Sequence, residues 1–249
     1  MTSHPPTTPT HNRLFYSAAS LTLLVLTFIG FRFFYLHLQA YPGRPLTPPI
    51  RTILIIHGIL MTAWMLLSVV QPLLVASGNK RLHMKLGMIA SVLAAAIAVA
   101  GYLVAVNSAR VNPPELKLFG LTPKEFLTVP LSGVVTFGAF VLVGVLNRRR
   151  PEVHRPIMFM ASLAIVAAAM GRMPALNDWY AGTWLEHWFS AFVSTLAVGA
   201  LMLVVKCALE RRFDRWFAGA YGAMVLVCVV ASLVAKTGAW VQIATILMR

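Results

Sequence analysis

Four histidines stand at or near the start of long apolar segments of the chain, where an ionisable side chain is unusual. They are His57, His83, His154 and His187. An ionisable residue inside a membrane segment is by default a hypothesis for function, and neutral imidazole is a common axial ligand of haem iron. The topology derived below puts His57 and His187 near the outer face of a membrane and His83 and His154 near the inner face. The sequence therefore predicts two histidine pairs, each able to hold one b-type haem.

One face of the apolar segment 51–76 carries most of its polar and aromatic side chains. Intervals of four and three residues put them on a single helical stripe that consists of His57, Met61, Trp64, Ser68 and Gln71. Such a stripe faces protein or a cavity, so our candidate pocket-lining residues are Met61, Trp64, Gln71 and, beside His187, Glu186. Gln71 also precedes Pro72, and its amide could instead bond to the carbonyl that the proline leaves unpaired.

Arg172 is a candidate partner for a cofactor carboxylate. It follows His154 by 18 residues, which is about five turns at 3.6 residues per turn, so the two side chains share a helical face. An arginine at that place could hold a haem propionate through charge-assisted hydrogen bonds. The alternative is that Arg172 ends its helix and extends toward lipid headgroups.

Methionines beside the histidines offer a different chemistry. Met61 stands four residues after His57, and Met158 stands four residues after His154. A thioether together with imidazole suits Cu(I). Copper handling is therefore an alternative to haem binding.

The elements that must position these residues are membrane-spanning helices. Of the 249 residues, 59% are hydrophobic and only 11% are charged, which excludes an ordinary water-soluble domain. The chain holds seven apolar runs long enough to cross a bilayer, over residues 14–38, 51–76, 82–107, 125–147, 155–173, 184–208 and 216–236. We predict an all-α, polytopic membrane helix bundle of three parts, which are a disordered tail (1–13), a seven-helix transmembrane domain (14–236) and a short interfacial C-terminal tail (237–249).

The distribution of basic residues sets the orientation. The net charge is +14, and eleven basic residues fall in or beside the loops after the second, fourth and sixth helices, namely Lys80, Arg81, Lys85, Arg148, Arg149, Arg150, Arg155, Lys206, Arg211, Arg212 and Arg215. Basic loops stay on the cytoplasmic side, so the N-terminus is predicted to be cytoplasmic in a multi-pass protein of the bacterial inner membrane. The positive charge then faces membrane lipid and does not indicate nucleic acid.

Two segments carry a resemblance to known families. HGILMTAWMLLSVVQPLLVASGNKRLHMKLG and RRRPEVHRPIMFMASLAIVAAAMGR resemble an uncharacterised family of bacterial multi-spanning membrane proteins of unknown function. The layout of one histidine per helix is loosely similar to the cytochrome b561 class of diheme membrane cytochromes. This likeness implies axial roles for His57 and His187 outside and for His83 and His154 inside. The b561 pattern has four consecutive histidine-bearing helices, whereas here the helix 125–147 intervenes without one.

Three functions follow from these observations. The first is a haem-binding membrane oxidoreductase or electron-transfer protein that passes electrons between a quinone or another redox partner and an acceptor. The second is a non-redox membrane protein, either a small transporter or an accessory subunit, with a polar cavity lined by His57, Trp64 and Gln71. The third is copper handling through histidine and methionine.

Overall fold

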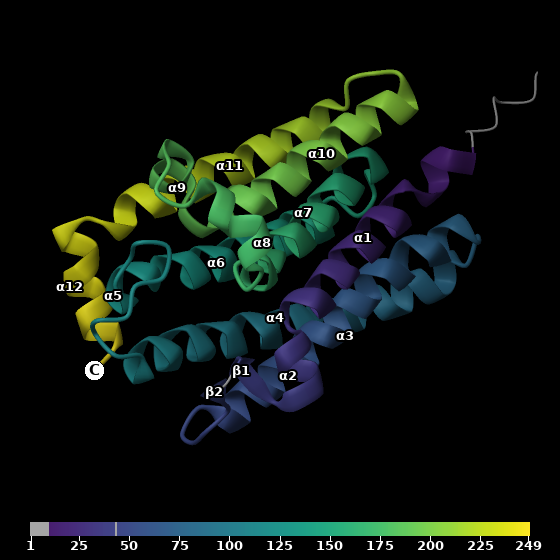
Figure 1. Cartoon of the computed structure of the whole chain (residues 1–249). Coiled ribbons are helices and arrows are strands. Elements are labelled where there is room, and N and C mark those ends of the chain that lie inside the picture. Colours follow the sequence, from purple (N-terminus) through teal and green to yellow (C-terminus); the bar gives the residue numbers. More distant parts are fainter. Residues whose placement is uncertain (1–9, 43) are drawn as a thin grey trace, which may run out of the picture.

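Long antiparallel helices make up nearly all of the computed structural model, which describes residues 10–42 and 44–249 (Figure 1). Within this part, six helical stretches are long and apolar enough to cross a membrane. Their long helices are α3 (Arg51–Ala76), α4 (Lys80–Val111), α6 (Thr128–Leu146), α7 (Pro151–Met170), α10 (Val193–Glu210) and α11 (Arg215–Ala235). A shorter apolar helix, α1 (Thr10–Gly30), packs beside them. The predicted all-α, multi-pass membrane fold is confirmed.

Short elements connect the long helices at the end of the bundle opposite the basic turns. They are α2 (Arg32–His37), β1 (Gln39–Tyr41), β2 (Arg44–Pro45), α5 (Pro123–Phe126), α8 (Pro174–Asn177), the 3-10 helix η1 (Asp178–Tyr180), α9 (Trp184–Phe189), the 3-10 helix η2 (Ser190–Phe192) and α12 (Gly238–Leu247). Strands β1 and β2 pair antiparallel. The connections α3–α4, α6–α7 and α10–α11 lie together at the other end (Figure 1). The basic loops therefore gather on one side, as the sequence predicts.

Helix α7 forms the centre of the bundle. It contacts α1, α6, α10 and α11, and most of its side chains are buried. Its stretch 160–170 is rich in alanine, which lets neighbouring backbones approach closely in a membrane. The closest approach is at Gly30, where a Cβ atom would collide with the carbonyl group of Ala169. Glycine at that position is therefore what allows α1 to lie against α7.

Two of the seven predicted helices are interrupted. The helix predicted over 14–38 ends at Gly30 and is followed by the short α2, so it does not run as one span. The helix predicted over 184–208 is broken into α9, η2 and α10 because Ser190 has a positive φ of 46°. Both breaks lie at the end of the bundle opposite the basic turns.

The chain termini differ from simple tails. Residues 1–9 of the predicted disordered tail lie outside the described part of the chain, and α1 begins at Thr10. The predicted C-terminal tail forms α12, where the Trp240 indole N–H donates to the carbonyl of Lys124 at 2.9 Å. Arg110, on α4, donates to the carbonyl of Leu247 at 3.0 Å. These bonds fix α12 across the ends of α4 and α5.

Candidate functional site

The two histidines that were predicted to pair near the inner face are neighbours. The rings of His83 and His154 have their centroids 6.4 Å apart, with an angle of 88° between the ring planes. His83 lies in the first turn of α4 and His154 in the first turn of α7. Helix α6, which carries no histidine, contacts both of these helices without separating the two rings. The helix without a histidine that lies between α4 and α7 in the sequence therefore does not keep the two imidazoles apart.

The end of α6 holds His154 in place. The Nδ1–H group of His154 donates to the carbonyl oxygen of Gly144 at 2.8 Å. The last four carbonyls of a helix have no partner within it, and Gly144 is in the last turn of α6. This bond puts the ring proton on Nδ1 and leaves the lone pair of Nε2 free. A neutral imidazole in that tautomer is ready to bind a metal through Nε2.

Gln71 supports the second ring from α3. In the orientation that satisfies its neighbours, its amide nitrogen donates to the carbonyl of His83 at 3.2 Å and to Nδ1 of His83 at 2.5 Å. Its amide oxygen accepts from the N–H of Gly87 at 3.0 Å. Gln71 therefore bonds across to α4, and the predicted bond to the carbonyl freed by Pro72 is not the contact it makes.

The orientation of the Gln71 amide is coupled to the tautomer of His83. When the amide nitrogen faces Nδ1, that atom accepts and the ring proton is on Nε2. A rotation of the amide by 180° would place its oxygen against Nδ1, which would then donate and leave Nε2 free as a ligand. The same rotation would break the bonds to the His83 carbonyl and to the Gly87 N–H. Gln71 is thus the residue that determines whether His83 can bind a metal through Nε2.

The other predicted pair, His57 and His187, is not brought together. His187 lies on α9, where its Nδ1 is 3.3 Å from the Lys236 ammonium and its ring packs edge-on against Trp188. Helix α9 lies beside α11, away from α3 (Figure 1). The sequence predicts the same depth for the two residues, but their helices belong to different parts of the bundle. The outer haem predicted from this pair has no second histidine ligand here.

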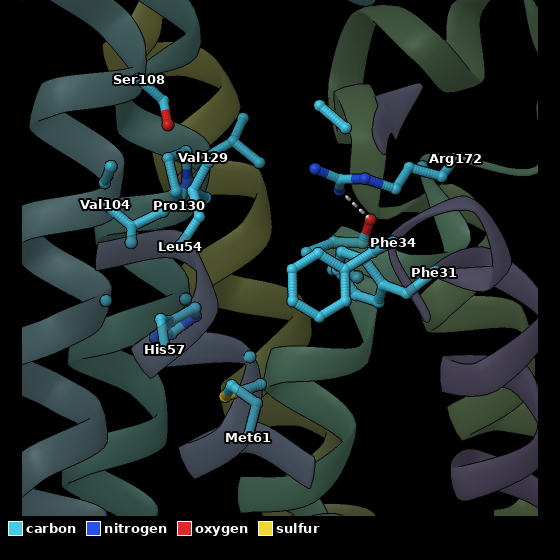
Figure 2. Close-up of a pocket in the computed structure, with 18 of the residues that line it drawn as sticks. Phe31, Phe34, Leu54, His57, Met61, Val104, Ser108, Val129, Pro130 and Arg172 are labelled. Carbon is cyan, nitrogen blue, oxygen red and sulfur yellow. Dashed lines mark hydrogen bonds between the residues drawn. The ribbon is translucent and has the colours of Figure 1, made fainter. Parts of the chain in front are cut away.

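His57 instead lines a large cavity. The cavity has a volume of about 760 Å³ and is enclosed by α2, the β1–β2 segment, α3, α4, α6 and α7. The Nδ1 atom of His57 is buried and has no hydrogen-bond partner. A Cβ atom at Gly101 would lie 3.5 Å from Cε1 of His57, so this glycine of α4 gives the ring room. Figure 2 shows His57 on one wall of the cavity, near Leu54 and Val104.

Arg172 reaches the same cavity from the end of α7. Its Nη1 donates to the carbonyl of Ala168 at 2.6 Å, whereas its Nε is buried without a partner. The guanidinium lies 4.5 Å from the ring centre of Phe31 and 5.1 Å from that of Tyr41. Figure 2 shows it extending over Phe31 into the open space. Arg172 therefore lines the cavity, while its side chain is only partly buried.

The four predicted pocket-lining residues fall at different places. Met61 lines the cavity. Trp64 is buried elsewhere in the core, where its indole N–H donates to Ser162 Oγ at 3.1 Å. Gln71 belongs to the inner histidine cluster, and Glu186 accepts from the N–H of Gly182 at 2.6 Å. The stripe on α3 therefore faces protein, but its residues are divided between the cavity, the core and the inner histidine cluster.

The aromatic wall of the cavity was not predicted from the sequence. Phe31, Phe34 and Tyr41 line it, although the segment that contains them reads as an aromatic belt at a membrane interface. Phe31 and Phe34 follow the end of α1 at Gly30, and Tyr41 ends the strand β1. No pattern of spacing marks that helix end.

The copper hypothesis receives no support from clustering of classical ligands. In residues 10–42 and 44–249, no group of three or more His, Cys, Asp or Glu side chains is arranged to hold a metal ion. Met158 packs at Gly144, where a Cβ would lie 2.5 Å from its sulfur. Copper binding by histidine and methionine stays a prediction. Comparisons with protein-family models, with curated proteins and with solved structures find no match for this chain.

Proposed function

We propose that the protein binds b-type haem in the bacterial inner membrane and takes part in electron transfer, with His83 and His154 as the two axial ligands. The supporting observation is the approach of their rings, with centroids 6.4 Å apart at one end of the bundle. This proposal keeps one of the two haems expected from the sequence. A quinone or another redox partner would be the donor.

The residues around the inner pair fit such a group. Imidazole nitrogen binds metal ions at about 2.0–2.1 Å, so two rings that face one ion from opposite sides have centroids roughly 6 Å apart. The Gly144 carbonyl fixes the tautomer of His154 that offers Nε2. Metal-binding histidines usually donate their other N–H to such a partner. For His83 the same role would require the Gln71 amide to turn its oxygen to Nδ1, with loss of its bonds to the His83 carbonyl and to the Gly87 N–H.

The chemistry would come from the cofactor, since bound haem supplies a one-electron redox centre. The chain itself would hold the two imidazoles, set their tautomers and surround them with apolar helices. Haem potentials depend on axial ligands, on the hydrogen bonds to them and on burial. Gln71 and Gly144 are accordingly the residues through which this protein would set the potential.

The test is the haem content of the purified full chain. Protein prepared from haem-replete cells should be red and give a b-type pyridine haemochrome with about one haem per chain. His154→Ala and His83→Ala should each abolish it, whereas His57→Ala should keep it. A colourless wild-type preparation, or equal haem content in all variants, would overturn the proposal. Metal analysis of the same sample tests copper.

A second candidate function, non-redox ligand binding or transport, is supported by a separate observation. The cavity that contains His57 is about 760 Å³ in volume, and no other histidine is among its described lining residues. Cavities of about 300–1,000 Å³ with a few convergent polar groups are typical ligand sites. This candidate does not depend on haem at the inner pair.

A further inference from the structure

The cavity between α2, α3, α4, α6 and α7 has the chemistry of a binding site. From its charge and walls we infer that it binds an amphiphile with a single carboxylate head, the class to which free long-chain fatty acids belong. The carboxylate pairs with Arg172, and the apolar body fills the space toward His57. This inference deepens the second candidate function and is independent of haem at the inner histidine pair.

The positive charge in the cavity indicates that the head group of the ligand is an anion. Arg172 is the only charged residue among the described residues that line the cavity. Its Nε donor is buried without a partner, and its bonded nitrogen Nη1 contacts a neutral carbonyl. The side chain as a whole is only partly buried, so the requirement for an acceptor comes from this one buried N–H group, which is costly to leave without a hydrogen bond. The guanidinium fork matches a carboxylate through two parallel hydrogen bonds.

Aromatic rings hold the guanidinium in position before a ligand arrives. Phe31 lies 4.5 Å and Tyr41 lies 5.1 Å from its central carbon. Contacts of this kind stabilise arginine over a ring face. These contacts also hold the side chain of Arg172 in place, so little conformational entropy is lost when an anion binds.

The rest of the cavity suits an apolar body. Its walls include the side chains of Phe34, Leu54, Val104, Val129 and Pro130, which Figure 2 shows around the open space. The polar side chains Thr27 and Tyr35 already have partners, since Thr27 donates to the Leu23 carbonyl and Tyr35 is 2.9 Å from Thr62 Oγ1. His57 alone offers a buried ring nitrogen without a partner on the opposite wall. Ser108 adds a hydroxyl to the wall on the side of α4 (Figure 2). The body of the ligand is therefore largely hydrocarbon, with room for an oxygen near His57 or Ser108.

The experiment uses the full chain in maltoside micelles and a photoactivatable diazirine analogue of palmitate. Native mass spectrometry measures its affinity, and peptide mapping after irradiation locates the crosslinks. We expect one molecule per chain and crosslinks on cavity residues such as Leu54 and Phe34. Palmitate should compete, whereas the uncharged hexadecanol and a decyl ubiquinone should compete at least tenfold less well.

Variants separate the charge from the shape of the site. A charged hydrogen bond contributes enough that Arg172→Gln should weaken palmitate binding about 10- to 100-fold. Arg172→Lys keeps the charge without the planar fork, so it should weaken binding less. Arg51→Gln is the matched control, because Arg51 is exposed at the start of α3 and does not line the cavity.

Three results would overturn the inference. They are equal competition by hexadecanol and palmitate in the wild type, stronger competition by the quinone, or crosslinks confined to the outer surface of the helices. The first of these requires no variant and is therefore independent of folding defects. Failure here would leave the haem proposal intact, since His83 and His154 do not line the cavity.

Discussion

Replacement of Gln71 by leucine isolates the support of the inner histidine pair. Leucine keeps much of the side-chain volume and removes the amide. The amide makes three contacts, at 3.2 Å to the His83 carbonyl, at 2.5 Å to its Nδ1 and at 3.0 Å to the Gly87 N–H. Hydrogen bonds between membrane helices contribute about 0.6 kcal/mol each on average, so the change should destabilise the fold by about 2 kcal/mol.

The same substitution should act on the cofactor. Loss of a residue that orients a metal-binding histidine typically lowers metal affinity by about 10- to 100-fold. We expect that loss for haem in Gln71→Leu, measured by titration of the apoprotein. The reduction potential should rise, because the His83 ring would donate to the amide oxygen only when the amide turns on haem binding, and without that acceptor it is a weaker electron donor.

The matched control is Gln242→Leu, at an exposed position of α12. It should change neither haem affinity nor potential. A merely structural role for Gln71 would lower stability and leave the potential of the remaining haem unchanged. That result, or wild-type affinity in Gln71→Leu, would refute the reasoning.

Three further predictions concern other parts of the molecule. Gly30→Ala should destabilise the protein by about 1–3 kcal/mol in a denaturant titration, because the added methyl meets the Ala169 carbonyl; Gly138→Ala, where a Cβ meets nothing within 4 Å, should not. His187→Ala should leave the haem spectrum intact, since the His187 ring contacts Lys236 and Trp188 rather than His57. Loss of haem in this variant would instead support a haem held by His57 and His187. Burial raises the pKa of Tyr180 from its ordinary 10.0 to about 12. The contribution of the neutral Tyr180 side chain to the free energy of unfolding should therefore be complete below pH 10 and lost as the pH rises toward 12. Absorbance at the phenolate band checks this value, and ionisation near pH 10 in the folded protein would contradict it.

The spans were predictable because hydrophobic length alone dictates them. The shared depth of His83 and His154 was also predictable, since the alternation of basic loops puts the starts of both helices on the same side of the membrane. Depth is only one coordinate, however, and the sideways arrangement of helices depends on packing. For that reason His57 and His187 have the same predicted depth but lie on helices in different parts of the bundle.

Local sequence features did not predict the structure where contacts between helices determine it. Gln71 next to Pro72 favoured a bond within its own helix, yet the amide reaches α4. Ser190 breaks its helix with no glycine or proline near it. Phe31 and Phe34, which line the cavity, follow the break after Gly30, and no glycine or proline spacing in the sequence distinguishes that break from a continuing span.

Low-temperature electron paramagnetic resonance of the oxidised, haem-loaded protein tests the central claim most directly. Two imidazoles on one iron give a low-spin signal, and the account predicts that signal in the wild type. It also predicts a change to high spin or loss of haem in His83→Ala and in His154→Ala. A high-spin wild type, or a low-spin signal that survives both substitutions, would contradict the assignment of His83 and His154 as axial ligands.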